Sequence, residues 1–209
     1  MSDPTTPAQE RPRGSAATLA LIPVVALALY GADQLSKVWV LGHLVEGTST
    51  PVIDGVLYWT FVRNPGAAFS MASGSTWIFT AIALLVVVAI VVLAKHIRSR
   101  AWAIVFGLVL GGVLGNLTDR LMREPGFGVG HVIDFIHTPW MMPAIYNVAD
   151  CGIVVGMCSV VILSLLDVGL DGQRGRSKKQ RDAADAARTA GHPDAARDAS
   201  PSVLNEKDS

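Results

Sequence analysis

Charged residues are scarce in this sequence, and their scarcity limits the class of protein. They make up 16% of the 209 residues, while 51% are hydrophobic. A soluble domain usually carries about 25% charged residues. Because the deficit coincides with long apolar runs, the composition excludes an ordinary soluble protein and predicts an integral membrane protein. The formal net charge is zero, which gives no indication of a nucleic-acid partner.

Cysteine is also scarce, and its two occurrences are Cys151 and Cys158. Both fall on one predicted helix, where a rise of about 1.5 Å per residue places them roughly 10 Å apart. That separation excludes a disulfide between them. We interpret both as small apolar packing residues that say nothing about the redox compartment.

Four apolar segments are long enough to cross about 30 Å of hydrocarbon. They cover approximately residues 16–41, 77–94, 101–121 and 144–166. Arg11 and Arg13 precede the first segment, so a signal peptide is an alternative interpretation. However, no clean small-residue cleavage site ends that segment, and Asp33 and Lys37 continue it as a favourable i, i+4 helical pair. We therefore predict that the first segment is a transmembrane helix.

The loop after this helix contains a predicted strand. Val56–Val62 is rich in aromatic and β-branched residues, and Arg63–Gly66 has the composition of a turn. Tyr58, Trp59 and Phe61 would anchor a small sheet at the depth of the lipid headgroups. The predicted fold class is therefore an all-α membrane protein with four transmembrane helices and a small surface β-sheet in the first outer loop.

The third apolar segment carries a row of glycines. Gly107, Gly111 and Gly115 follow one another at i, i+4 spacing, which permits close helix packing. We favour packing inside the helix bundle over a dimer interface on this row.

Basic residues predict the orientation and the boundaries of the membrane domain. The N-terminal segment, the turn Lys95–Arg100 and the cluster from Arg174 to Arg181 are basic, and basic segments are retained in the cytoplasm. Both termini are then cytoplasmic. We divide the chain into a disordered cytoplasmic leader (1–15), a four-helix membrane domain (16–167) and a disordered cytoplasmic tail (168–209).

With this orientation, polar residues from distant parts of the chain converge on the outer face. A carboxylate at the mouth of a membrane-spanning helix is costly and marks a functional site by default. Two carboxylates brought together by a loop can have different pKa values, so that one is an ionised base and the other a protonated acid. This is the chemistry of an aspartic protease. The converging residues are Asp33, Asn64, Asn116, Asp119, Arg120, Asp134, Asn147 and Asp150.

Three alternatives remain open. His131, Asp134 and His137 are of metal-ligating types, but their spacing in a predicted loop is undistinguished. Ser36 and Lys37 would form a nucleophilic pair, but adjacent helical residues point about 100° apart. A small proton-coupled transporter would also use membrane acids. Transporters place their sites near the bilayer midplane between repeats, whereas no repeat is evident here and the acids lie to one side.

Five segments carry most of these polar residues. They are Asp33-Gln-Leu-Ser-Lys37, Asn64-Pro-Gly-Ala-Ala-Phe69, Gly111-Gly-Val-Leu-Gly-Asn-Leu-Thr-Asp-Arg120, Val132-Ile-Asp-Phe135 and Tyr146-Asn-Val-Ala-Asp150. In this order they resemble the motif blocks of lipoprotein signal peptidase (signal peptidase II). One block alone would be weak evidence, but the ordered set makes the resemblance specific. It spans approximately residues 17–166, which is everything except the two tails.

The resemblance implies an aspartyl endopeptidase of the bacterial cytoplasmic (inner) membrane, with its active site at the outer face. Such an enzyme cleaves diacylated prolipoproteins before the lipidated cysteine, and its partners are these substrates and membrane lipids. By motif position, Asp134 and Asp150 would be the catalytic pair. No cofactor or metal is expected. Substrate binding would fall to Asn64, Asn116, Arg120 and Asn147, and structural support to Asp33, Lys37 and Asp119.

Overall fold

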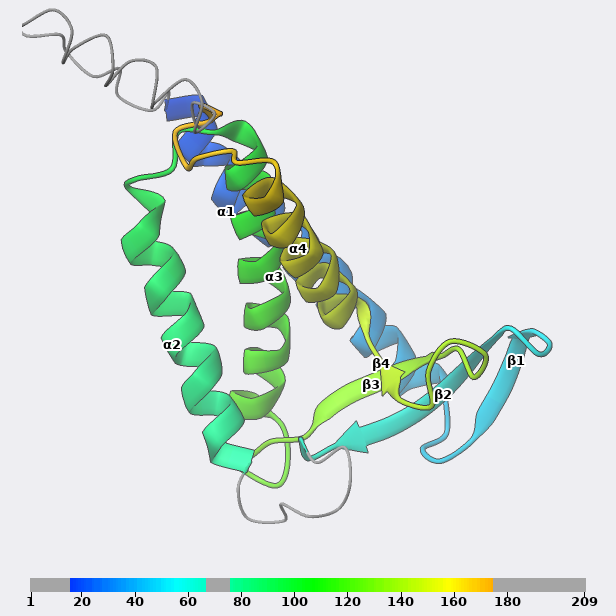
Figure 1. The fold of residues 1–209 in the computed structure, drawn as a ribbon. Coiled ribbons are helices and arrows are strands. Elements are labelled where there is room, and N and C mark those ends of the chain that lie inside the picture. The colour runs from blue at the N-terminus through cyan, green and yellow to red at the C-terminus, as the bar shows by residue number, and fades with distance from the viewer. Residues whose placement is uncertain (1–15, 67–75, 175–209) are drawn as a thin grey trace, which may run out of the picture. The chain divides into compact units, whose positions relative to one another are not determined.

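The computed structural model describes residues 16–66 and 76–174, which Figure 1 shows in colour. One compact unit extends to Gln173 and contains all the helices and strands described below. The predicted leader at 1–15 and most of the predicted tail lie outside the described residues. So do Ala67–Phe69, the last three residues of the second motif block.

The prediction of four transmembrane helices is confirmed. All four described helices are long and apolar enough to cross a membrane. Their bounds are α1 Ala16–His43, α2 Thr76–Ala94, α3 Arg100–Met122 and α4 Val148–Leu165. The predicted start of the fourth segment, near Ala144, is wrong, because a short strand and the helix cap Asn147 precede α4.

Helix α3 packs against each of the other three helices. The glycine row explains its close approach to α1, and the preference for packing within the bundle is confirmed. A Cβ atom added to Gly111 would lie 2.6 Å from the backbone oxygen of Ala26. One added to Gly107 would lie 2.7 Å from Cβ of Val25. Such distances are shorter than van der Waals contact, so these backbones approach closely because glycine occupies the row.

The predicted strand is confirmed, but the sheet is larger than predicted. It is antiparallel, in the order β1-β2-β3-β4 (Figure 1). The first loop supplies β1 and β2, whereas β3 and β4 come from the segment between α3 and α4, for which we predicted only a loop. Arg63 and Asn64, predicted to lie in a turn, are instead the last residues of β2. The bounds are β1 Ser49–Ile53, β2 Leu57–Asn64, β3 Val132–His137 and β4 Ile145–Tyr146.

A small apolar cluster joins the sheet to the end of α1. It consists of Val40 from α1, Phe61 from β2, and Ile133 and Phe135 from β3. Phe61 is 3% exposed, so its predicted role as a headgroup anchor is wrong. Strand side chains alternate between the two faces of a sheet. Because Ile133 and Phe135 face this cluster, Asp134 points to the opposite face.

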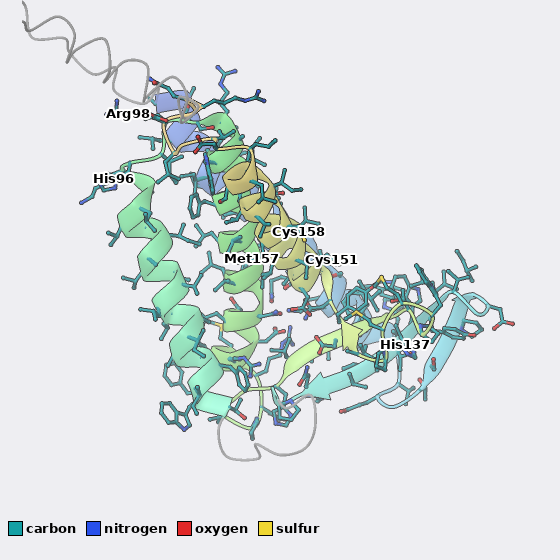
Figure 2. All side chains as sticks on the ribbon, in the orientation of Figure 1. His96, Arg98, His137, Cys151, Met157 and Cys158 are labelled. Carbon is teal, nitrogen blue, oxygen red and sulfur yellow. The ribbon has the colours of Figure 1, made fainter. Side chains whose placement is uncertain are left out.

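The interpretation of the two cysteines as packing residues is also wrong. Cys151 and Cys158, labelled on α4 in Figure 2, are free and exposed in the described structure. They lie on the apolar outer surface of α4, together with Val154, Val155 and Val161, which are also exposed.

The segment after α4 turns back onto the start of α3, beyond the boundary that we predicted at residue 167. The backbone oxygen of Leu170 accepts hydrogen bonds from the backbone amides of Arg98 at 2.8 Å and Ser99 at 3.0 Å. The indole nitrogen of Trp102 donates to the backbone oxygen of Val168 at 2.9 Å. These contacts satisfy amides at the start of α3, where Ser99 makes no side-chain cap hydrogen bond.

Candidate active site

Asp134 lies on β3, next to β2 in the sheet. Two amide side chains hold its carboxylate. Asn64, at the end of β2, donates to Oδ2 at 2.7 Å. Asn147, the cap of α4, donates to Oδ1 at 2.7 Å. Asp134 is 2% exposed, so this carboxyl group has little contact with water.

Asp150 occupies the third position of α4, where it forms a capping box with Asn147. The backbone amide of Asn147 donates to Oδ2 of Asp150 at 3.1 Å, and the backbone amide of Asp150 donates to Oδ1 of Asn147 at 3.0 Å. Asn116 from α3 donates to Oδ1 of Asp150 at 2.8 Å. The N-terminus of a helix favours a negative charge, so the position stabilises an ionised carboxylate.

Asn147 therefore bridges the two carboxyl groups, which differ in their surroundings. Asp150 is half-buried, whereas Asp134 is buried. The pKa of Asp134 is raised to about 7, mainly by burial. The negative charge of Asp150 also raises it, while the hydrogen bonds from Asn64 and Asn147 oppose the rise. Two carboxyl groups in unequal environments are suited to separate acid and base roles.

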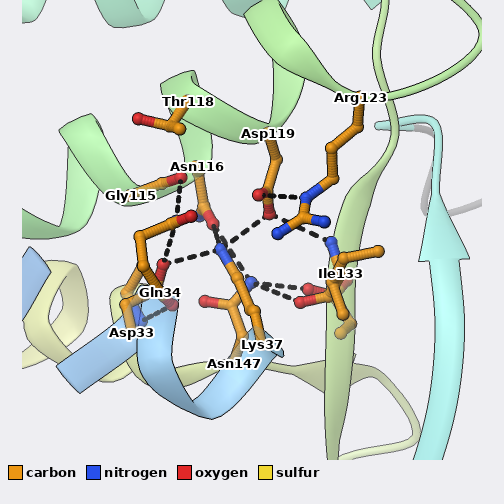
Figure 3. Close-up of polar contacts among 12 residues, drawn as sticks. Asp33, Gln34, Lys37, Gly115, Asn116, Thr118, Asp119, Arg123, Ile133 and Asn147 are labelled. Carbon is orange, nitrogen blue, oxygen red and sulfur yellow. Dashed lines mark hydrogen bonds and ion pairs between the residues drawn. The ribbon is translucent and has the colours of Figure 1, made fainter. Parts of the chain in front are cut away.

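A buried ionic network is centred on Lys37 (Figure 3). The ammonium nitrogen of Lys37 lies 2.8 Å from Oδ2 of Asp33 and 2.8 Å from Oδ2 of Asp119. All three side chains are 0% exposed. The predicted i, i+4 pair of Asp33 and Lys37 is confirmed. The contact with Asp119 was not predicted, because it joins two helices that are distant in the sequence.

Arg120 lies beside the pair and retains hydrogen-bonding capacity. Its guanidinium group sits over the ring of Phe79, 5.3 Å from the ring centroid. Among the described residues, its Nη1 is a buried nitrogen without a hydrogen-bond partner. The carboxylate of the adjacent Asp119 binds Lys37, Arg123 and the backbone amide of Ile133.

The structure brings the nine predicted site residues together at one end of the bundle. Sequence reasoning missed three contributors to this site: the capping box at Asn147 and the backbone amides of Ile133 and Ala149. The cap had a sequence signal, an Asn followed three residues later by an acid at the start of an apolar run. The two amides had none, because any residue type supplies a backbone N–H.

The alternative groupings are not formed in the described structure. Ser36 donates its hydroxyl to the backbone oxygen of Asp33 at 2.7 Å, while Lys37 faces the buried carboxylates. Within residues 16–66 and 76–174, no three His, Cys, Asp or Glu side chains are grouped to hold a metal ion. The absence of a metal requirement stays a prediction.

Comparison with known proteins covers the segments that carry this site. The family model described as signal peptidase (SPase) II matches residues 25–166 and so includes all nine site residues. The chain belongs to the signal peptidase II family. It is therefore a peptidase and a multi-pass membrane protein, and this membership replaces the transporter alternative.

Relatives named lipoprotein signal peptidase span most of the chain. The protein from Leifsonia xyli subsp. xyli (strain CTCB07) is 51% identical over 168 residues, covering 80% of this chain and 77% of that protein. The protein from Mycobacterium avium (strain 104) is 40% identical, covering 83% of this chain and 99% of that protein.

The fold is also similar to solved structures of bacterial membrane enzymes. One, determined by the in meso method at 2.3 Å resolution, has a TM-score of 0.64 and 26% identity. The similarity covers 79% of this chain and 98% of that chain.

Proposed function

We propose that this peptidase is a membrane-embedded aspartyl endopeptidase that removes signal peptides from diacylglyceryl-modified prolipoproteins. Cleavage takes place immediately before the lipidated cysteine. The observation that carries the proposal is the pair Asp134 and Asp150, bridged by Asn147 and unequal in burial. The family membership and the lipoprotein signal peptidases among its relatives support the substrate class.

The unequal burial assigns a role to each acid. Asp150, ionised at the start of α4, takes a proton from a water molecule, which attacks the scissile carbonyl carbon. Asp134, whose pKa is raised to about 7, begins in the protonated form. It donates a hydrogen bond to the developing oxyanion, and a proton is later delivered to the leaving amine. Neither a cysteine nor a serine nucleophile is required.

Arg120 and the three asparagines provide hydrogen-bond donors around this reaction. The unpartnered Nη1 of Arg120 is available to a substrate carbonyl or to the oxyanion. Asn64, Asn116 and Asn147 are engaged with the two carboxylates, so their first role is to hold the geometry of the pair. In this arrangement Arg120 makes the more direct contact with substrate.

The helices and the distribution of basic residues support a location and an orientation for the enzyme. We place the enzyme in the bacterial cytoplasmic membrane, with both termini inside and the site at the outer face. The signal helix and acyl chains of a prolipoprotein then enter sideways from the lipid. A protease with such a substrate needs its acids at the membrane boundary, where acyl chain and peptide meet.

The test is incubation of the purified, detergent-solubilised protein with a diacylated prolipoprotein, followed by mass spectrometry. The expected products are a free signal peptide and a protein that begins with the diacylated cysteine. A matched precursor without the lipid should be cleaved poorly. EDTA should leave the rate unchanged. No cleavage of the diacylated precursor by the folded protein would overturn the proposed function, and loss with EDTA restored by zinc would revive a metal mechanism.

A further inference from the structure

Lys37 connects the supports of both proposed catalytic acids. An ammonium group has three hydrogen-bond donors and no acceptor. Its three partners are Oδ2 of Asp33 at 2.8 Å, Oδ2 of Asp119 at 2.8 Å and Oδ1 of Asn116 at 3.0 Å (Figure 3). The donors of Lys37 are all used, so this residue has none left for a substrate.

The first partner reaches the start of α4. Oδ1 of Asp33 accepts a hydrogen bond from the backbone amide of Ala149 at 3.0 Å. That amide lies in the first turn of α4, where backbone N–H groups have no partner within the helix. Ala149 immediately precedes Asp150. Asp33 therefore fixes the backbone that carries the proposed base.

The second partner makes the equivalent contact with the sheet. Oδ2 of Asp119 accepts a hydrogen bond from the backbone amide of Ile133 at 3.2 Å. Ile133 immediately precedes Asp134. Each buried carboxylate bound by Lys37 thus accepts a hydrogen bond from the backbone amide of the residue just before one of the two proposed catalytic acids.

The third partner determines which way an asparagine faces. Oδ1 of Asn116 accepts from Lys37 and from the side-chain amide of Asn147, at 3.0 and 3.1 Å. Because Lys37 has no acceptor, the oxygen of Asn116 must face it. The amide nitrogen of Asn116 then faces Asp150, to which it donates at 2.8 Å.

We propose that Lys37 is the positioning residue that sets the separation and orientation of the two catalytic aspartates. This inference rests on the proposed function. Lys37 acts at a distance by joining α1 to α3 and, through their carboxylates, to the backbones of α4 and β3. An error of about 1 Å in placing a catalytic group reduces rates by roughly 100-fold, so a single buried cation has a large effect on turnover.

The charge of Lys37 provides a second, separable effect. Its positive charge lowers the pKa of Asp134, against the larger effect of burial. Removing that charge raises the pKa of Asp134, so the protonated form persists to higher pH. The charged side chains that act on Asp134 are Lys37 from α1, Arg120 from α3 and Asp150 from α4, and its uncharged neighbours are Asn64 from β2 and the helix cap Asn147.

The test compares Lys37→Met, Lys37→Arg and the exposed control Lys95→Met in the full chain. For Lys37→Met we expect kcat to fall at least about 100-fold with KM changed less than about threefold. In this variant, the fall of kcat on the alkaline side of the pH profile (the alkaline limb) should move to higher pH. Lys37→Arg should keep the limb in place because it keeps the charge, while kcat falls. Lys95→Met should match the wild type.

If Lys37→Met does not fold, a double variant with unchanged net charge takes its place in the test. Asp33→Asn with Lys37→Met removes one buried charge of each sign, and the asparagine oxygen can still accept from Ala149. This double variant should show the same shift of the limb. An unchanged kcat in the folded variants, or a reduced kcat with an unmoved limb in the two variants that carry Lys37→Met, would overturn the proposed role of Lys37.

Hydrogen exchange separates this inference from the proposed function. In Lys37→Met, peptides containing the amides of Ala149 and Ile133 should exchange faster than in the wild type, while peptides from α2 should not. This measurement needs no substrate. Unchanged exchange refutes the positioning by Lys37, even if the wild type cleaves prolipoproteins. Faster exchange in Lys37→Met, together with no cleavage by the wild type, refutes the proposed function but still supports the positioning of the two backbones by Lys37.

Discussion

The side-chain amide nitrogen of Asn147 lies 2.7 Å from Oδ1 of Asp134, a residue 13 positions away in the sequence. The same asparagine is the N-cap of α4, with Asp150 completing its capping box. One side chain therefore couples the start of a membrane helix to the strand beside it. The separation of the two acids depends on this coupling, and the predictions below test its consequences.

Replacing Asp134 or Asp150 by Asn should abolish cleavage while the protein remains folded. The substitution preserves size and part of the hydrogen bonding but removes the exchangeable proton. Loss of general acid–base catalysis costs roughly 10²–10⁴-fold in rate. Because the two acids act as a unit, the double variant should be scarcely worse than either single one. The measurement is accumulation of uncleaved diacylated precursor.

The matched control is Asp54→Asn, which changes an exposed aspartate between β1 and β2. It should cleave at the wild-type rate. Near-normal cleavage by a well-inserted Asp150→Asn variant would rule out the aspartyl mechanism.

The pH profile of kcat should fall on the alkaline side. Burial raises the pKa of Asp134 to about 7, and this group must be protonated to donate to the oxyanion. As the pH rises through that value the acid form is lost, so kcat decreases. Cleavage rates measured at saturating substrate across the neutral range check this. A profile that stays flat into the alkaline range would show that Asp134 is not the acid.

Gly111→Ala should destabilise the bundle, and Gly31→Ala should not. An added Cβ at Gly111 would meet the backbone of Ala26 at 2.6 Å, whereas one at Gly31 would meet nothing within 4 Å. Overpacking costs about 1–3 kcal/mol, while Gly to Ala in an open helical position gains up to about 1 kcal/mol. Thermal unfolding in detergent compares the two variants. Equal Tm values would contradict the close packing of α1 on α3.

Truncation after Gln173 should preserve both stability and cleavage, since the helices, the sheet and the site lie within that unit. Truncation after Asp167 should lower the Tm, because it removes the Leu170 oxygen that receives two backbone amides at the start of α3. The two truncated proteins differ by one short segment, so their unfolding curves isolate its contribution. Identical curves would show that the segment is dispensable.

Topology can be measured by labelling introduced cysteines with a membrane-impermeant reagent, in a background where Cys151 and Cys158 are replaced by Ala. A cysteine at Ser49 in β1 should be labelled from outside. A cysteine at Arg98 should be labelled only after the membrane is permeabilised. The reverse pattern would invert the orientation and place the site at the cytoplasmic face.

Local sequence patterns were sufficient to predict the helices and the residues that gather at the candidate site. Long apolar runs predict spans because the bilayer thickness determines how many apolar residues a helix needs. Successive spans alternate in direction, so polar residues at the end of α1, the end of α3 and the start of α4 must gather on one side. The pair of Asp33 and Lys37 followed from helical spacing alone.

Other features depend on contacts between segments distant in sequence, and the tertiary structure alone decided them. The strand β3 contains strand-favouring residues (Val132, Ile133, Phe135 and Ile136), but its pairing with β2 joins segments about 70 positions apart and is not contained in the local pattern. The contact of Lys37 with Asp119 exists because glycines let α1 approach α3 closely. The unequal burial of Asp134 and Asp150 arises in the same way. Burial is set by what packs around a side chain, and a sequence pattern does not contain that information.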